Sequence, residues 1–291
     1  MIEPERKPVA LPDGSVSTLE WGADAPLLHF SHANGFNAQT YRALLSPLVG
    51  RFRVVASDMR GHGFSTLPAI PDMQDGWRIF GSDLAAVLDA LDPRPVILAG
   101  HSMGAIASLM VASRFPARVR GIVLVEPVLV PRFSRIFQRL IRMMGITPPP
   151  GTDLATMADK RRSVFPSFEM ALSAYRGRGA FKTWQDETLA DYLRGGLIET
   201  GNGTEMRLAC APEWEAASFR NAPSGSASIA RGVRCPLTLI YAGNGTAREH
   251  QVQTVKRFVP AARLVQVPGT THFLPMERPD IVREEIARIA S

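Results

Sequence analysis

The sequence predicts an α/β fold in which a mostly parallel central sheet is flanked by helices. Short apolar runs typical of buried strands recur at residues 26–30, 53–57, 96–99 and 121–125. Segments with helical spacing of their apolar residues lie between them, at 39–49 and 76–91. Apolar strands that alternate with helices in this rhythm are typical of a parallel sheet covered on both faces.

The same pattern extends toward both ends of the chain. Residues 15–21 alternate between polar and apolar side chains, which predicts a strand at the edge of the sheet. Two further strands are expected at 236–241 and 263–267, and helices at 249–258 and 279–290. These elements complete the sheet and its covering layers.

The rhythm breaks between residues 128 and 231, where no clear buried strand is found. Helical stretches are expected there at 132–144, 153–175 and 185–200, separated by Pro-rich and Gly-rich pieces. About a hundred residues are too many for a loop in a compact domain, so we expect an inserted helical cap. The predicted organisation is a core formed by residues 1–127 and 232–291, with the cap at 128–231.

Ser102 lies in the sequence GHSMG at 100–104, after an apolar run and before a segment of small and apolar residues. A strand, an abrupt turn and a helix make a nucleophile elbow, which holds the serine in strained backbone geometry above the sheet. Glycine is needed at 100 and 104 because a Cβ would collide where strand and helix meet. The start of the helix also presents unpaired N–H groups. Ser102 is therefore the candidate nucleophile.

Composition limits the classes of partner. The 291 residues are 45% apolar and 21% charged, as in an ordinary soluble globular protein. The net charge of +6 comes mostly from scattered arginines. The densest basic group, at 132–142, is interleaved with apolar residues at helical spacing, which indicates the wet face of an amphipathic helix. We expect no nucleic-acid partner.

Location and cofactors are predicted from what the sequence lacks. No apolar run approaches the ~18 residues that span a bilayer, and the charged, Pro-rich N-terminus lacks the apolar core of a secretory signal. We therefore expect no membrane span and a cytoplasmic location. Cys210 and Cys235 do not resemble a disulfide framework or a metal site. No metal and no cofactor are expected, and the oligomeric state is open.

Four motifs follow one another along the chain. They are HANGF at 32–36, DMRGHGFS at 58–65, GHSMG at 100–104 and PGTTHF at 268–273. With these pieces in order, the whole chain resembles the α/β-hydrolase superfamily, including its members with a lid. The resemblance implies the α/β-hydrolase fold and a serine hydrolase similar to esterases and lipases, but not the substrate, because one fold hosts many reactions. Segment 58–65 is expected to be structural, with Asp58 and Arg60 paired.

A serine hydroxyl needs a base to take its proton, and the chain has six histidines. His272 follows the last predicted strand, where a parallel sheet presents its active edge. The order along the chain, nucleophile first and histidine last, also fits the family. We therefore expect His272 to be the base.

The resemblance leaves two positions for the acid that orients this base. Most similar enzymes carry an Asp after the strand that here ends at Tyr241, but residues 242–248 contain no carboxylate, and the first to follow is Glu249. A minority place the acid one strand earlier, where this chain has Glu126. An acid at the end of a buried strand needs a partner, and protonated His272 supplies one. We expect Glu126, with Glu249, a Ser–His dyad or a further acid not identified from the sequence as alternatives.

The tetrahedral intermediate of acyl transfer needs two backbone donors, the oxyanion hole. One is expected to be the N–H of Met103. Counting from His32, as in the similar enzymes, makes the Asn34 N–H the other, with Ala33 as a neighbouring possibility. His32 is expected to brace this loop, and strand alternation turns His101 away from the nucleophile. The candidate substrate-binding residues are His32, Ala33, Phe36 and His101.

The expected function is hydrolysis of a small-molecule carboxylic ester with an apolar, short-to-medium acyl group, through an acyl-enzyme on Ser102. A second hypothesis is hydrolysis of carbon–carbon bonds in vinylogous diketones, whose anionic substrates would favour arginine from the cap. A third is a ligand-binding protein with little turnover. Dehalogenases and epoxide hydrolases resemble this fold but use an Asp nucleophile, so Ser102 argues against both.

Overall fold

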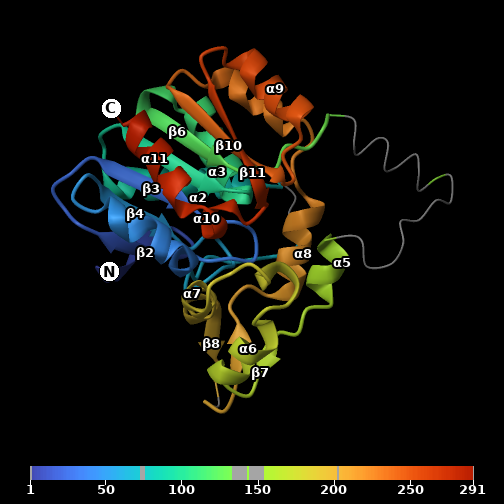
Figure 1. Ribbon diagram of the computed structural model, residues 1–291. Helices are drawn as coiled ribbons and strands as arrows, with labels where there is room; N and C mark the ends of the chain where they lie inside the picture. Colours follow the sequence, from blue (N-terminus) through green and yellow to red (C-terminus); the bar gives the residue numbers. More distant parts are fainter. Residues whose placement is uncertain (1, 73–75, 133–142, 144–153, 202, 291) are drawn as a thin grey trace.

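The structure is a computed structural model that describes residues 2–72, 76–132, 143, 154–201 and 203–290. Its centre is an eight-stranded sheet in the order β1-β2-β4-β3-β5-β6-β10-β11 (Figure 1). The strands are β1 (Glu5–Leu11), β2 (Gly14–Trp21), β3 (Leu27–Ser31), β4 (Arg53–Ser57), β5 (Val96–His101), β6 (Val119–Val125), β10 (Leu237–Asn244) and β11 (Arg263–Thr271). The pairs β1–β2 and β2–β4 are antiparallel and the others are parallel. The predicted mostly parallel sheet is confirmed.

Because β3, β4, β5, β6, β10 and β11 run parallel, their carboxyl ends reach the same edge of the sheet. This is the edge at which open α/β sheets bind ligands. The prediction that residues 15–21 form the outer strand is wrong, because β1 pairs outside β2. Most of β1 is exposed, so no pattern of buried residues marks it in the sequence.

Two hydrophobic cores lie on the two faces of the sheet. The helices α2 (Arg78–Leu91), α3 (Met103–Arg114) and α9 (Glu249–Phe258) contribute to one core, and α1 (Arg42–Leu45) and α11 (Pro279–Ile289) to the other. Alternation along β5 divides its side chains between them: Leu98 belongs to the first, Ile97 and Ala99 to the second. Short helices complete these layers: η1 (Ala38–Tyr41), η2 (Ser46–Leu48), η3 (Pro116–Arg118) and α10 (Leu274–Glu277).

The helix expected at 39–49 is broken into η1, α1 and η2. Pro47 lies in η2 and has no N–H with which to continue an α-helix, so the last turn becomes a 3-10 turn. In the described ranges, every helix is too short or too polar to cross a bilayer.

The long segment between β6 and β10, two strands that pair directly in the sheet, is named the insertion. Its described elements are α5 (Leu154–Asp159), β7 (Val164–Phe165), α6 (Phe168–Tyr175), η4 (Gly179–Phe181), α7 (Asp186–Gly196), β8 (Leu197–Glu199), β9 (Met206–Leu208), α8 (Pro212–Arg220) and η5 (Ser226–Gly232). Most of them group together below the sheet in Figure 1. They have a small core of their own that includes Phe165, Phe181, Trp184 and Tyr192.

The expected secondary structure of this insertion is partly wrong. The ranges 153–175 and 185–200 are not continuous helices, since β7, β8 and β9 form a three-stranded antiparallel sheet. These strands have two or three residues each, too few to show a period-two pattern. The helix and basic group expected at 132–144 lie almost wholly outside the described residues. The division at 128 and 231 stays a prediction.

Candidate active site

Ser102 lies on a sharp turn between β5 and α3. Its backbone is at φ 56° and ψ −113°, a strained conformation for a residue with a side chain. An added Cβ at Gly100 would lie 2.6 Å from the backbone carbon of Gly104, and one at Gly104 would overlap the carbonyl of Ser31. Both glycines are therefore required for strand and helix to meet. This is the geometry expected of a nucleophile elbow.

The structure brings Ser102, His272 and Glu126 into one hydrogen-bonded series. Ser102 Oγ lies 3.0 Å from His272 Nε2, and His272 Nδ1 lies 3.0 Å from Glu126 Oε2. His272 directly follows β11 and Glu126 directly follows β6, so the parallel sheet delivers both to the edge where β5 ends. Ser102 is 6% exposed and the His272 side chain 23% exposed. A hydroxyl, an imidazole and a carboxylate in this order can activate the hydroxyl as a nucleophile.

The Glu126 carboxylate is fully buried and held by backbone donors. The Ala242 N–H donates to Oε1 at 2.7 Å and the Thr246 N–H donates to Oε2 at 2.8 Å. A Cβ at Gly245 would overlap both carboxylate oxygens, so glycine leaves the space that they occupy. Burial raises the pKa of Glu126, but hydrogen bonds from His272, Ala242 and Thr246 outweigh it and leave the pKa below its ordinary value. The carboxylate therefore stays charged near neutral pH.

Glu249, the alternative acid, lies elsewhere. Its carboxylate accepts hydrogen bonds from Tyr241 Oη at 2.7 Å and from Gln253 Nε2 at 2.7 Å. These bonds, first that from Gln253 and then that from Tyr241, lower its pKa. In the described part of the chain, the acid hydrogen-bonded to His272 is Glu126.

The two amides expected to bind an oxyanion have no acceptor among the described residues. Met103 opens α3, so its N–H has no partner within the helix. The Asn34 N–H is also without an acceptor in the described structure, whereas the Ala33 N–H donates to Tyr41 Oη at 3.1 Å. The alternative donor Ala33 is therefore occupied. The Asn34 side chain is fixed by donating to the Glu215 carbonyl at 2.9 Å.

His32 and His62 brace the loop that carries Asn34. His32 Nε2 accepts from the Met59 N–H at 2.8 Å, and its Nδ1–H donates to the Ala33 carbonyl at 2.7 Å. His62 Nε2 accepts from the Gly35 N–H at 3.0 Å. Both rings are buried and their nitrogens bond within the protein, as a bracing role for His32 requires. The role of His32 in substrate binding stays a prediction.

Segment 58–65 is structural, as predicted, but through other ion pairs. Asp58 accepts from Arg6, from the Ala38 N–H and from the Phe64 N–H. Arg60 pairs instead with Asp83, at 2.8 Å. The expected Asp58–Arg60 pair is therefore wrong, because each side chain meets a partner that is distant in the sequence.

The buried histidines predict an acid-sensitive fold. Burial lowers the pKa of His29 to about 3, of His32 to about 4 and of His62 to about 3. Unfolded histidines titrate near pH ~6.5, so below that pH the unfolded chain binds protons that the folded chain does not. The contribution of these histidines to the free energy of unfolding is therefore fully present above pH ~6.5. It decreases toward pH ~4, by up to about 1.4 kcal/mol per pH unit for each histidine.

Urea unfolding between pH ~7 and pH ~5 measures this slope, in a range above the titration of Glu126. His29→Gln removes one histidine, which lies inside β3 with its Nε2 at 3.1 Å from Ser57 Oγ. We expect it to lower the slope by up to about 1.4 kcal/mol per pH unit. An unchanged slope would contradict the assignment.

His101, one of the predicted substrate-binding residues, bonds within the protein through both ring nitrogens, and its role in substrate binding stays a prediction. The ring is fully buried, and its Nε2–H donates to the His272 carbonyl at 2.8 Å while Nδ1 accepts from Tyr41 Oη at 2.7 Å. Tyr41 in turn accepts from the Ala33 N–H. A continuous chain of hydrogen bonds thus links the loop that holds Asn34 to the backbone of His272. Sequence reasoning missed Tyr41, which nothing in its local sequence distinguishes.

Phe36 lies at the contact between the core and the insertion. The centroid of its ring lies 5.5 Å from the ring centroids of Trp184 and Tyr192. The ring is also stacked on that of Phe273, with 6.2 Å between the two centroids. The Phe273 ring also meets the ring of His272, at 5.9 Å. This aromatic cluster gives the His272 side of the site an apolar surface.

Arg161 from the insertion is partly buried close to Phe36, and its charge is already paired. The guanidinium contacts Glu215 at 2.9 Å and also donates to the hydroxyls of Tyr175 and Tyr192. Arg161, Phe36 and Tyr192 border a gap of about 10 Å³ between the two parts of the chain. A partly buried ion pair of this kind offers no free positive charge to a substrate.

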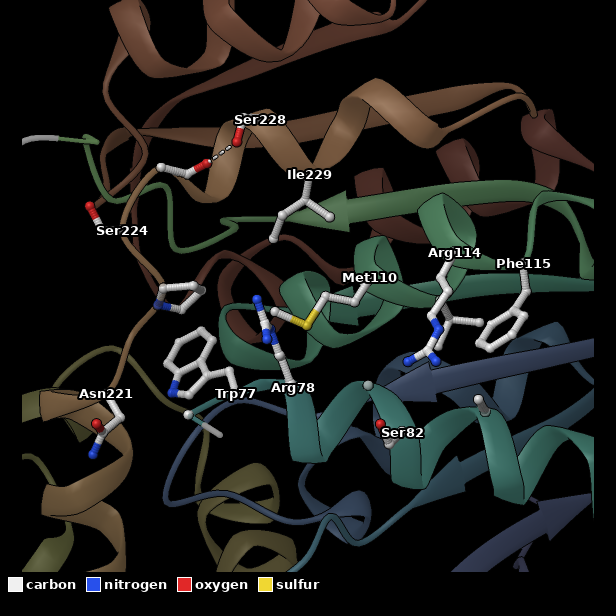
Figure 2. Close-up of a pocket in the computed structure, with 16 residues that line it drawn as sticks. Trp77, Arg78, Ser82, Met110, Arg114, Phe115, Asn221, Ser224, Ser228 and Ile229 are labelled. Carbon is white, nitrogen blue, oxygen red and sulfur yellow. Dashed lines mark hydrogen bonds between the residues drawn. The ribbon is translucent and has the colours of Figure 1, made fainter. Parts of the chain in front are cut away.

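A larger cavity of about 760 Å³ lies between α2, α3 and the segment 221–229 (Figure 2). Figure 2 shows Trp77, Met110 and Ile229 along it, with Arg78 and Arg114 among the polar groups. Ser102, His272 and Glu126 do not line it. The site is therefore located by the hydrogen-bonded series and not by this cavity. Within the described ranges, no group of three His, Cys, Asp or Glu side chains could hold a metal ion.

The fold and the Ser102–His272–Glu126 series define the class, an α/β protein with a candidate serine nucleophile at the carboxyl edge of its sheet. The sequence model of the alpha/beta hydrolase family matches residues 27–285. The chain belongs to this family.

Relatives with different activities share parts of the sequence. A haloalkane dehalogenase of Mesorhizobium japonicum is 32% identical over 47% of this chain and 41% of its own length. An esterase of Mycobacterium tuberculosis is 30% identical over 55% of this chain and 49% of its own. The 30 kDa subunit of magnesium chelatase from Rhodobacter capsulatus is 26% identical over 85% and 81%. The chain spans under half the length of the first curated relatives it matches.

Solved structures show the same fold over the whole chain. The structure of an E-2-(acetamidomethylene)succinate hydrolase covers 99% of this chain and 99% of its own, with a TM-score of 0.79 and 21% identity. At this identity the likeness supports the α/β-hydrolase fold alone.

Proposed function

We propose that this protein is a serine hydrolase that cleaves carboxylic esters with an apolar, short-to-medium acyl group. The observation that carries the proposal is the series Ser102 Oγ, His272 Nε2, His272 Nδ1 and Glu126 Oε2, joined by two contacts of 3.0 Å. The N–H groups of Met103 and Asn34, which have no acceptor in the described structure, support it. They are the two donors that an oxyanion requires.

The reaction follows from the position of each group. His272 Nε2 takes the proton of Ser102 as Oγ attacks the ester carbonyl carbon, and the oxyanion receives the N–H groups of Met103 and Asn34. The carbon–oxygen bond then breaks, and the alcohol leaves with the proton from His272. The acyl group is now bound to Ser102 Oγ. His272 takes a proton from water as the water attacks the acyl carbonyl carbon, and the carboxylic acid is released as Ser102 regains its proton from His272. The Glu126 carboxylate holds the imidazole in the required tautomer and stabilises its cation.

The surroundings of the site favour an uncharged substrate over an anionic one. The aromatic cluster of Phe36, Trp184 and Phe273 beside His272 is suited to an apolar acyl group. Arginine from the insertion would favour the anionic diketones of carbon–carbon hydrolases, but Arg161 is neutralised by Glu215. The esterase relative is consistent with this choice, and Ser102 does not suit the dehalogenase reaction.

The proposal is tested by labelling and by a substrate series. The protein is treated with a fluorophosphonate, the label is located by peptide mass spectrometry, and p-nitrophenyl esters from acetate to decanoate are compared. We expect the label on Ser102 and a turnover that depends on acyl length, with the optimum among the shorter chains. Labelling with turnover of vinylogous diketones alone would indicate a carbon–carbon hydrolase. Neither label nor turnover would indicate a ligand-binding protein.

A further inference from the structure

Thr246 lies against the His272–Glu126 pair, in a loop that contributes no carboxylate of its own. Thr246 Oγ1 is 3.0 Å from His272 Nδ1 and 3.3 Å from Glu126 Oε2. The Thr246 N–H donates to the same Oε2 at 2.8 Å. One residue of the loop after β10 therefore meets both members of the pair.

The protons allow only one arrangement of these three groups when Glu126 is ionised. The carboxylate only accepts, so the Thr246 hydroxyl donates to Oε2, and the single proton on His272 Nδ1 is shared between Oε2 and Oγ1. The imidazole is then held by two acceptors at equal distance, and the carboxylate by the hydroxyl as well as by backbone amides. A ring that is held from two sides has less freedom to rotate away from Ser102.

We propose that Thr246 is a positioning residue that holds the His272 imidazole toward Ser102. The proposal rests on the proposed ester hydrolysis. It follows from the 3.0 Å contact between Thr246 Oγ1 and His272 Nδ1. Gly245 keeps the neighbouring space open, as a side chain there would displace Glu126.

The first test separates the hydroxyl from the shape of the side chain. Thr246→Val keeps the volume and the backbone N–H but removes Oγ1, whereas Thr246→Ser keeps the hydroxyl. We expect Val to lower kcat by about 5- to 30-fold with KM unchanged, and Ser to stay within about 3-fold of wild type. Thr254→Val is the matched control, because the Thr254 hydroxyl bonds only within α9, to the His250 carbonyl. Equal kcat in Thr246→Val, Thr254→Val and wild type would overturn the positioning role.

A second measurement, by proton NMR, distinguishes failure of this proposal from failure of the proposed function. The downfield proton resonance of His272 Nδ1–H, assigned by its loss in His272→Gln, reports the contact without any turnover. We expect it to shift in Thr246→Val and to stay in place in Thr246→Ser. If the protein hydrolyses no ester but the resonance responds as stated, the proposed function fails and the contact stands. If the enzyme is active but the resonance has the same position in Thr246→Val and wild type, the role of Thr246 is overturned and the proposed function stands.

Discussion

Replacing Ser102 with alanine is expected to lower kcat for ester hydrolysis by about four orders of magnitude or more. The substitution removes the Oγ that lies 3.0 Å from His272 Nε2, so the base has no hydroxyl to deprotonate. Turnover of the best p-nitrophenyl ester measures the loss, and wild-type protein inactivated by a fluorophosphonate gives the background rate. The same variant should take up no label.

Ser108→Ala is the matched control for this variant. Ser108 is buried on α3, the helix that begins next to Ser102, and its hydroxyl has no hydrogen-bond partner within the described structure. We expect kcat within about twofold of wild type. The free energy of unfolding should be unchanged or higher by about 1 kcal/mol, because an unsatisfied hydroxyl is removed. Equal losses of kcat in Ser102→Ala and Ser108→Ala would attribute the effect to packing of α3. Near-normal turnover in Ser102→Ala would exclude Ser102 as the nucleophile.

Replacing Glu126 with glutamine is expected to reduce kcat by about three to four orders of magnitude. Glutamine keeps the volume but places an amide among donors that all point at a carboxylate, namely the N–H groups of Ala242 and Thr246 and the Nδ1–H of His272. The imidazole then loses the partner that selects its tautomer and stabilises its charge. Steady-state kinetics on the same ester measures this, with circular dichroism to establish that the variant is folded.

Glu249→Gln provides the control, because the Glu249 carboxylate bonds to Tyr241 and Gln253 instead of His272. We expect kcat within about threefold of wild type. Small and equal losses in Glu126→Gln and Glu249→Gln would show that neither acid serves the base. A larger loss in Glu249→Gln would reverse the assignment.

The features that the sequence predicted well are those with a local cause. The elbow around Ser102 needs glycine at 100 and 104 because two backbones meet there, and this requirement is visible in five consecutive letters. The buried strands are visible because both faces of a parallel sheet are covered, which leaves continuous apolar runs. Parallel strands end at one edge, so residues that directly follow them, such as Glu126 and His272, were predicted to meet.

The features that the sequence did not predict depend on partners far along the chain. His101 was placed among substrate-binding residues, but its two ring nitrogens are taken by Tyr41 and the His272 carbonyl. Arg60 was paired with Asp58 because they are close in sequence, whereas the folded chain brings it to Asp83. The small sheet of β7, β8 and β9 was missed because such short strands are defined only by their pairing.

By itself, the sequence determined the α/β layering, the elbow and the edge at which chemistry can occur, since periodicity and glycine act over a few residues. The sequence favoured Glu126 as the acid but left Glu249 open, and only the tertiary structure shows that Glu126 is the one hydrogen-bonded to His272. The tertiary structure also distinguishes the two candidate oxyanion donors of the loop. The Ala33 N–H donates to Tyr41 Oη, whereas the Asn34 N–H has no acceptor among the described residues. A hydrogen bond requires its donor and acceptor atoms to lie within about 3 Å of each other. Which groups are paired therefore depends on how distant segments pack together, and local sequence patterns do not show this.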